Sequence, residues 1–135
     1  MKFSCSQQAL AKAFNVVSKA ITSRTTIPIL KGILLQVSAD AVLTMSASDL
    51  NLTIEKKMDV EETEAGEVVV QAKLFGDIIR KLPSSTVHVS EENDNLLIQC
   101  ANSEFHIVGF PADEFPNIKD TEEITDKIVF EKELL

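Results

Sequence analysis

The sequence of 135 residues contains no tryptophan and no tyrosine, and it has only four glycines, four prolines and two cysteines. So few glycines and prolines exclude a collagen-like or low-complexity chain, while an apolar content of 44% supplies the surface that a folded domain must bury. No apolar run is long enough to span a bilayer, and the N-terminus lacks the apolar stretch of a signal peptide. We therefore expect one ordinary folded domain, located in the cytoplasm.

Metal ligands and catalytic groups are also scarce. Cys5 and Cys100 lie far apart in apolar, strand-like segments, and we expect them to be buried, reduced thiols. His88 and His106 stand alone in alternating segments, without the spacing of a metal-binding motif. The adjacent acids at positions 113–114 are interpreted as solvated loop charges, because neighbours in a loop point apart and seldom share a metal ion. The sequence therefore predicts no metal site, no cofactor and no catalytic residue.

Acidic residues are missing from the first part of the chain. Residues 1–39 contain five bases and no acid, whereas residues 40–135 contain eight bases and all 21 acids. The first part therefore carries a charge of +5, although the net charge of the whole chain is −8. Such asymmetry indicates one surface that meets a polyanion beside an otherwise acidic exterior. Chance clustering of surface charge is the alternative explanation of the composition.

Hydrophobic patterns divide the chain into two similar units, each with the order strand, helix, strand, strand, strand. The elements of the first unit are expected over residues 1–5, 7–20, 33–37, 43–45 and 52–54. Those of the second unit are expected over residues 68–70, 73–82, 87–89, 96–98 and 105–108. The first helix begins after Ser6, whose hydroxyl can cap it, and the acidic stretch over residues 59–67 is interpreted as a loop. The sequence therefore predicts an α+β fold. The run at residues 46–51 contains Asp49, which is interpreted as a turn-forming residue.

Both predicted helices are amphipathic. Their outer faces carry the cations, namely Lys12 and Lys19 in the first helix and Lys73, Arg80 and Lys81 in the second. The apolar side of the second helix is expected to contain Leu74, Ile78, Ile79 and Leu82. Gly76 inside this helix costs about 1 kcal/mol relative to alanine, and close approach of a neighbouring helix is one explanation, with neutral drift as the other. Two such helices side by side could follow phosphates without reading bases.

Several segments carry a specific pattern of residues. Near the N-terminus these are residues 1–3, 17–20 and 23–34, the last reading Ser-Arg-Thr-Thr-Ile-Pro-Ile-Leu-Lys-Gly-Ile-Leu. Further on they are residues 48–50, 73–83 and 110–116, the last reading Phe-Pro-Ala-Asp-Glu-Phe-Pro. In this order and spacing they closely resemble the bacterial sliding clamp family, the β subunit of DNA polymerase III.

The resemblance implies a DNA-clamp fold, in which two strand-helix-strand-strand-strand units place two helices on one side of antiparallel sheets. It implies an N-terminal clamp domain over residues 1–118, an acidic linker over 119–126 and the truncated start of a second domain over 127–135. It also implies a non-catalytic processivity factor of DNA replication. In this family two subunits close into a ring around double-stranded DNA, and the ring tethers the replicative polymerase. The polymerase and the clamp loader would bind the second and third domains, which this chain lacks.

The resemblance further implies roles for particular residues. DNA contacts are expected at Arg24, in the loop after the first helix, and at the helix cations Lys12, Lys19, Lys73, Arg80 and Lys81. A dimer interface is expected at Phe105, Ile107 and Leu74, although strand alternation would also bury Phe105 and Ile107 in the core. Two other hypotheses remain open. One is a small acidic α+β module that binds a protein partner and has no DNA role, and the other is a metal-dependent enzyme that uses Asp113 and Glu114.

Overall fold

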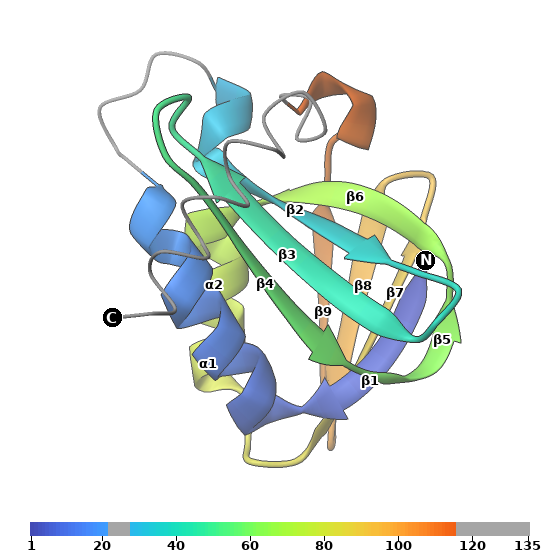
Figure 1. Cartoon of the computed structure of the whole chain (residues 1–135). Helices are drawn as coiled ribbons and strands as arrows, with labels where there is room; N and C mark the ends of the chain where they lie inside the picture. Colours follow the sequence, from blue (N-terminus) through green and yellow to red (C-terminus); the bar gives the residue numbers. More distant parts are fainter. Residues whose placement is uncertain (22–27, 116–135) are drawn as a thin grey trace.

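A computed structural model describes residues 1–21 and 28–115, which form two antiparallel sheets and two α-helices (Figure 1). The elements follow one another as β1 (Lys2–Ser6), α1 (Gln7–Val17), β2 (Gly32–Val37), β3 (Val42–Ser48), β4 (Thr53–Asp59), β5 (Glu61–Glu64), β6 (Gly66–Gln71), α2 (Ala72–Lys81), β7 (Thr86–Glu92), β8 (Asn95–Cys100) and β9 (Ser103–Val108). Short 3-10 helices are η1 (Ser18–Ala20), η2 (Pro28–Lys31) and η3 (Ala112–Glu114). The predicted linker and the start of a second domain, residues 119–135, lie outside the described residues.

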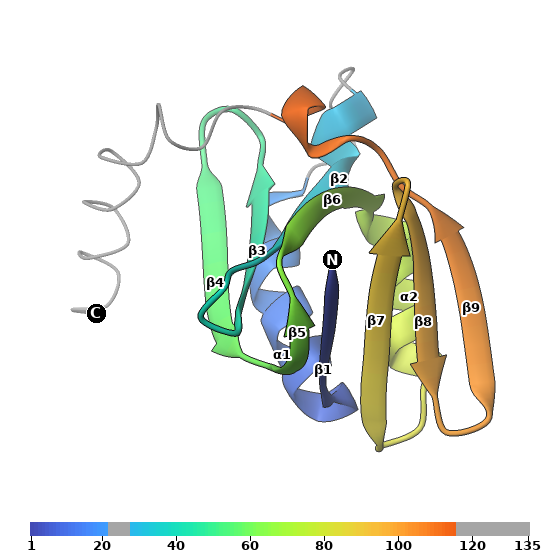
Figure 2. The same cartoon turned by 90° about the vertical axis from the view of Figure 1, so that its right-hand side faces the viewer.

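The two predicted units exchange their first strands. One sheet has the order β5-β1-β7-β8-β9 and the other β4-β3-β2-β6. Thus β1 of the first unit pairs with β7 of the second, and β6 of the second unit pairs with β2 of the first. The two sheets lie beside each other with the helices packed behind them (Figure 2). The predicted α+β fold with two helices on one side of antiparallel sheets is confirmed.

The hydrophobic core lies between the helices and the inner faces of both sheets. Leu10, Phe14 and Val17 of α1 are buried there, together with Phe75 and Ile79 of α2. The helix α1 begins as predicted, because the Ser6 side-chain oxygen accepts a hydrogen bond from the Ala9 amide at 3.1 Å. The apolar stripes of both helices therefore determine which side of each helix remains in water.

Two predictions about secondary structure and burial were wrong. The acidic stretch around residues 61–64 is not a loop but strand β5, which pairs antiparallel with the edge of β1. Main-chain hydrogen bonds hold this strand, and its glutamates point away from the core, as is common on protected edges. In α2, Leu74 is 42% exposed and Phe75 occupies the core instead. The helix is therefore rotated relative to the predicted apolar side.

The turn between β3 and β4 is built by Asp49, as predicted from its neighbours. The Asp49 carboxylate accepts hydrogen bonds from the amides of Asn51, at 2.9 Å, and Leu52, at 2.6 Å. These backbone hydrogen bonds, that from Leu52 above all, hold the pKa of Asp49 below its ordinary value of 3.8. The turn is therefore stabilised by the ionised form of the side chain.

Both cysteines are free thiols, as predicted, but only Cys100 is fully buried. Each pairs with Val87 from opposite sides, so Cys5 and Cys100 lie two strands apart, a separation of about 10 Å that no disulfide spans. Burial raises the pKa of Cys5 to about 11, which makes its thiol unreactive at neutral pH.

Within the two described stretches, no helix is long and apolar enough to cross a membrane.

The chain begins in a buried ion pair. The Met1 amine lies 3.3 Å from Oε1 of Glu91, and the Met1 carbonyl accepts a hydrogen bond from the Glu91 amide at 2.8 Å. The other carboxylate oxygen of Glu91 accepts from the Asp94 amide at 2.8 Å, in the turn between β7 and β8. Glu91 thus connects Met1, just before β1, to the turn between β7 and β8 in the second unit.

Candidate nucleic-acid interface

The helices α1 and α2 pack directly against each other, and Gly76 makes their close approach possible. A Cβ atom at position 76 would lie 2.5 Å from Cε2 and Cζ of Phe14. The Phe14 ring meets Phe75 edge to face, with ring centroids 6.0 Å apart. At the start of α1, the Gln7 side-chain Nε2 donates a hydrogen bond to the Ile79 carbonyl near the end of α2, at 2.8 Å. Close helix packing is therefore the structural role of this glycine.

The five predicted helix cations that the structure describes are all exposed. Lys12 lies about 160° around α1 from Phe14, and thus on the solvent side of the helix, and Lys19 is an exposed residue of η1, which follows α1. Lys73 and Arg80 lie within about 60° of Gly76 around α2, on the side toward α1. Lys81 lies further around α2, away from α1. Gln7–Ala20 contains no acid, and the one acid of α2 is Asp77.

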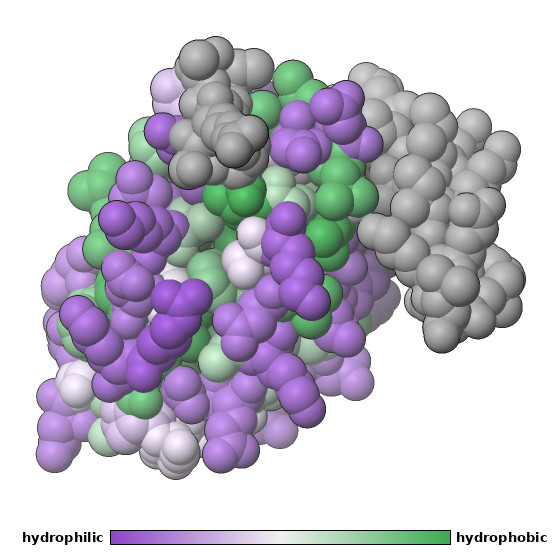
Figure 3. Space-filling model, turned by 90° about the vertical axis from the view of Figure 1, so that its left-hand side faces the viewer, coloured by the Kyte–Doolittle hydropathy of each residue, from purple (hydrophilic) through white to green (hydrophobic). Residues whose placement is uncertain are grey.

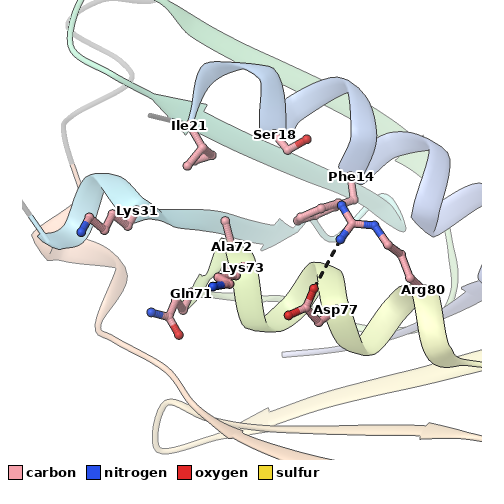
Figure 4. Close-up of a pocket in the computed structure, with 9 residues that line it drawn as sticks. All are labelled: Phe14, Ser18, Ile21, Lys31, Gln71, Ala72, Lys73, Asp77 and Arg80. Atoms are coloured by element: carbon pink, nitrogen blue, oxygen red, sulfur yellow. Dashed lines mark hydrogen bonds and ion pairs between the residues drawn. The ribbon is translucent and has the colours of Figure 1, made fainter. Parts of the chain in front are cut away.

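A hollow of about 530 Å³ lies between the two helices and η2. Phe14 and Ser18 line it from the α1 side, and Lys73, Asp77 and Arg80 line it from α2 (Figure 4). The space-filling view of this face shows hydrophilic side chains on both sides of a furrow with apolar atoms in its floor (Figure 3). The hollow is thus open to solvent and bordered by positive charge.

Arg80 is the most constrained cation of this face. Its guanidinium carbon lies 5.7 Å from the centroid of the Phe14 ring, and its Nη1 lies 3.4 Å from Oδ1 of Asp77. Figure 4 shows the Asp77 and Arg80 side chains turned toward each other beside the ring. Both side chains remain about half exposed, so this pair contributes little to stability.

Two further cations join this side of the molecule, and the sequence did not identify either. Lys31, the last residue of η2, is exposed and lines the hollow. Lys56 of β4 is exposed and shares a strand face with Ile54 and Met58, which pack against the core. Because α1 packs against this face of β4, Lys56 lies on the helix side of the domain. The sequence alone could not assign Lys56 to this side, because the assignment requires the pairing register of β3 and β4.

The outer faces of the sheets carry the opposite charge. Strand alternation places acids there on several strands, namely Glu62, Glu64, Glu67, Glu92 and Glu104. Lys2 and Lys57 are the exposed cations of the same outer faces within residues 1–21 and 28–115. Cations therefore dominate the helix side and acids dominate the sheet side, as the uneven charge of the sequence indicated.

The remaining predicted site residues are one DNA contact in a loop and three residues of a dimer interface. Arg24 lies outside the described residues. Leu74 is 42% exposed on α2, and Phe105 is half-buried on β9, the edge strand of its sheet. Ile107 is only 3% exposed and packs in the core of this domain, as strand alternation predicted. The interface role stays a prediction for Leu74, Phe105 and Ile107.

Comparison with known proteins identifies relatives over most of the chain. Residues 1–119 match the family model of the DNA polymerase III beta subunit, N-terminal domain. The Beta sliding clamp of Bacillus subtilis (strain 168) is 37% identical over 132 residues, covering 91% of this chain and 35% of that protein. The Beta sliding clamp of Vibrio harveyi is 38% identical over 122 residues, covering 89% of this chain and 83% of that sequence.

Solved structures agree with these relatives. The crystal structure of the DNA polymerase sliding clamp from Bacillus subtilis superposes with a TM-score of 0.80 at 34% identity, covering 87% of this chain and 33% of that one. The structure of Caulobacter crescentus pol III beta superposes with a TM-score of 0.80 at 35% identity, covering 86% of this chain and 31% of that one. The chain thus spans about a third of the length of the Bacillus subtilis relative. Since the family model matches residues 1–119, this chain belongs to the DNA polymerase III beta subunit family and contains its N-terminal domain.

Proposed function

We propose that this chain supplies the N-terminal domain of a ring-shaped sliding clamp that encircles duplex DNA during replication. Its helix side faces the duplex and its sheets face outward. The domain catalyses no reaction and holds DNA without reading its sequence. Within this proposal, residues 1–118 form the clamp domain, 119–126 a linker and 127–135 the start of a second domain.

The segregation of charge between the two sides of the domain is the observation that carries this proposal. Lysine and arginine side chains on α1, η1 and α2 attract a polyanion, and the glutamates on the outer sheet faces repel it from the wrong side. No aromatic side chain is exposed on α1 or α2 for stacking against unpaired bases, since Phe14 and Phe75 are buried. Diffuse attraction to phosphates is what a protein that slides along a duplex requires.

The same proposal includes the partners of the full-length family. A second clamp subunit would close the ring, with Phe105 and Ile107 of the edge strand β9 and Leu74 of α2 as the predicted interface side chains. The replicative polymerase and the clamp loader would bind the second and third domains of the full-length family. Such a protein acts in the cytoplasm. The comparisons lend no support to the alternative of an acidic interaction module without a DNA role.

Charge reversal on the helix side tests the proposal. We expect Lys12→Glu with Lys73→Glu to weaken binding of this chain to a short DNA duplex, measured by fluorescence anisotropy at low salt. Each lost phosphate contact should lower the slope of log affinity against log salt by about 0.9. Both lysines are exposed, so the melting temperature should change little.

A matched control reverses two cations on the outer sheet faces. Lys2→Glu with Lys57→Glu changes the net charge by the same amount at exposed positions. This variant should keep most of the wild-type affinity and salt slope. Equal losses in the two double variants would show that net charge alone governs binding and would refute the assignment of the helix face. Absence of wild-type binding at low salt would refute the DNA role of this chain.

A further inference from the structure

Asp77 is an acid placed among the cations of the helix side. It lines the hollow together with Lys31, Lys73 and Arg80, and it is the one acidic side chain within Gln7–Ala20 and Ala72–Lys81. Its carboxylate lies 3.4 Å from the Arg80 guanidinium. A charge of this sign opposes the attraction of phosphate that the surrounding cations provide.

The fold does not account for this acid. The Asp77 and Arg80 side chains are 49% and 59% exposed, and such surface pairs contribute little to stability. Aspartate is also a poor residue for the interior of a helix. The Arg80 guanidinium is positioned by the Phe14 ring as well as by Asp77, so removal of the carboxylate would leave it supported from one side.

We propose that Asp77 limits the contact between Arg80 and the backbone phosphates of duplex DNA, so that the helix side holds DNA loosely. This inference rests on the proposed function. A phosphate that enters the hollow must either displace Asp77 from Arg80 or approach within a few ångströms of its negative charge. In both cases the carboxylate weakens the contact. Loose binding is what permits a duplex to move past this surface, because each tight phosphate contact must break before the next forms.

The test compares Asp77→Asn with the wild-type chain on a short DNA duplex over a range of salt concentrations. Two unit charges about 6 Å apart in water interact by an energy that corresponds to about a threefold change in affinity. We therefore expect Asp77→Asn to bind at least about three times more tightly at low salt. Release of Arg80 should add one phosphate contact and steepen the salt slope by about 0.9. The melting temperature should stay within about 2 °C of the wild type.

Two controls separate this role from a general effect of charge. Asp40→Asn makes the same chemical change at an exposed position in the turn before β3, and it should leave affinity and slope nearly unchanged. In an Arg80→Ala background, Asp77→Asn should no longer steepen the salt slope. A steeper slope in that background, or an equal gain from Asp40→Asn, would overturn the role of Asp77.

The outcomes also distinguish this inference from the proposed function. If wild type and Asp77→Asn bind the duplex with equal affinity and slope, the role of Asp77 is refuted while the DNA-binding function stands. If neither binds at low salt, both are refuted.

Discussion

Replacement of Gly76 by alanine should destabilise the domain, although alanine is the better helix former. Alanine gains about 1 kcal/mol over glycine inside a helix. Its Cβ, however, would lie 2.5 Å from two carbon atoms of the Phe14 ring, well inside the normal contact distance of about 3.5 to 4.0 Å. The ring is 3% exposed, and a shift toward the hollow that it lines would cost its packing against Phe75 and Arg80.

The expected loss of stability follows from these opposing effects. Overpacking a tight core costs about 1 to 3 kcal/mol, and two simultaneous clashes at a helix crossing place Gly76→Ala at the upper end. After subtraction of the helix gain, we expect a net loss of about 2 kcal/mol in the free energy of unfolding. For a domain of this size that corresponds to a melting temperature lower by about 8 °C, measured by circular dichroism.

Two comparisons make this reasoning refutable. Asn15→Ala on the exposed side of α1 makes a favourable helix substitution without a neighbour to clash with, and it should raise the melting temperature slightly. Phe14→Leu should make Gly76→Ala much less costly, because the shorter side chain vacates the space of the ring, so the two changes should couple by at least about 1 kcal/mol. A Gly76→Ala variant as stable as the wild type would show that the helices separate freely.

Two further predictions concern charged groups. Because the folded-state pKa of Asp49 lies below 3.8, its carboxylate stabilises the fold at neutral pH, and this stabilisation is lost as the pH falls through the folded pKa. Asp49→Asn should therefore flatten the decline of melting temperature below pH 3.8, and an unchanged pH profile would contradict the role of the turn. Glu91→Ala should cost about 1 to 3 kcal/mol in urea unfolding, since it leaves the Met1 amine and the Asp94 amide without their partner. Glu92→Ala next to it is exposed and should be nearly neutral.

Most of the strands could be predicted because one face of each is buried, which produces an alternating pattern. Strand β5 could not, because its residues Glu61–Glu64 include no apolar side chain and its stability comes from main-chain pairing with β1. Pairing between strands far apart in the sequence was also inaccessible. The repeat of element order indicated two units, but nothing in either pattern indicates that β1 joins the second unit and β6 the first.

The helix cations could be predicted because residues on one side of a helix recur at fixed intervals. The side of α2 that faces the core was harder to predict, since apolar residues at positions 74, 75, 78, 79 and 82 fit more than one orientation of the helix. Contact of Gly76 with Phe14 selects the orientation that buries Phe75 and exposes Leu74. Lys56 could not be assigned to the helix side, because that requires knowing that α1 packs against β4.

The exchange of first strands between the two units has a consequence for how the chain folds as it is synthesised. When residues 1–59 have left the ribosome, β1 has neither of its neighbours, because β5 and β7 follow later in the chain. The sheet of β2, β3 and β4 likewise waits for β6 to cover the edge of β2. Neither half is then a folding unit by itself, despite the repeated order of elements. Folding completes only after β7 pairs with β1 across 80 to 88 positions, a long loop closure that makes assembly late and cooperative.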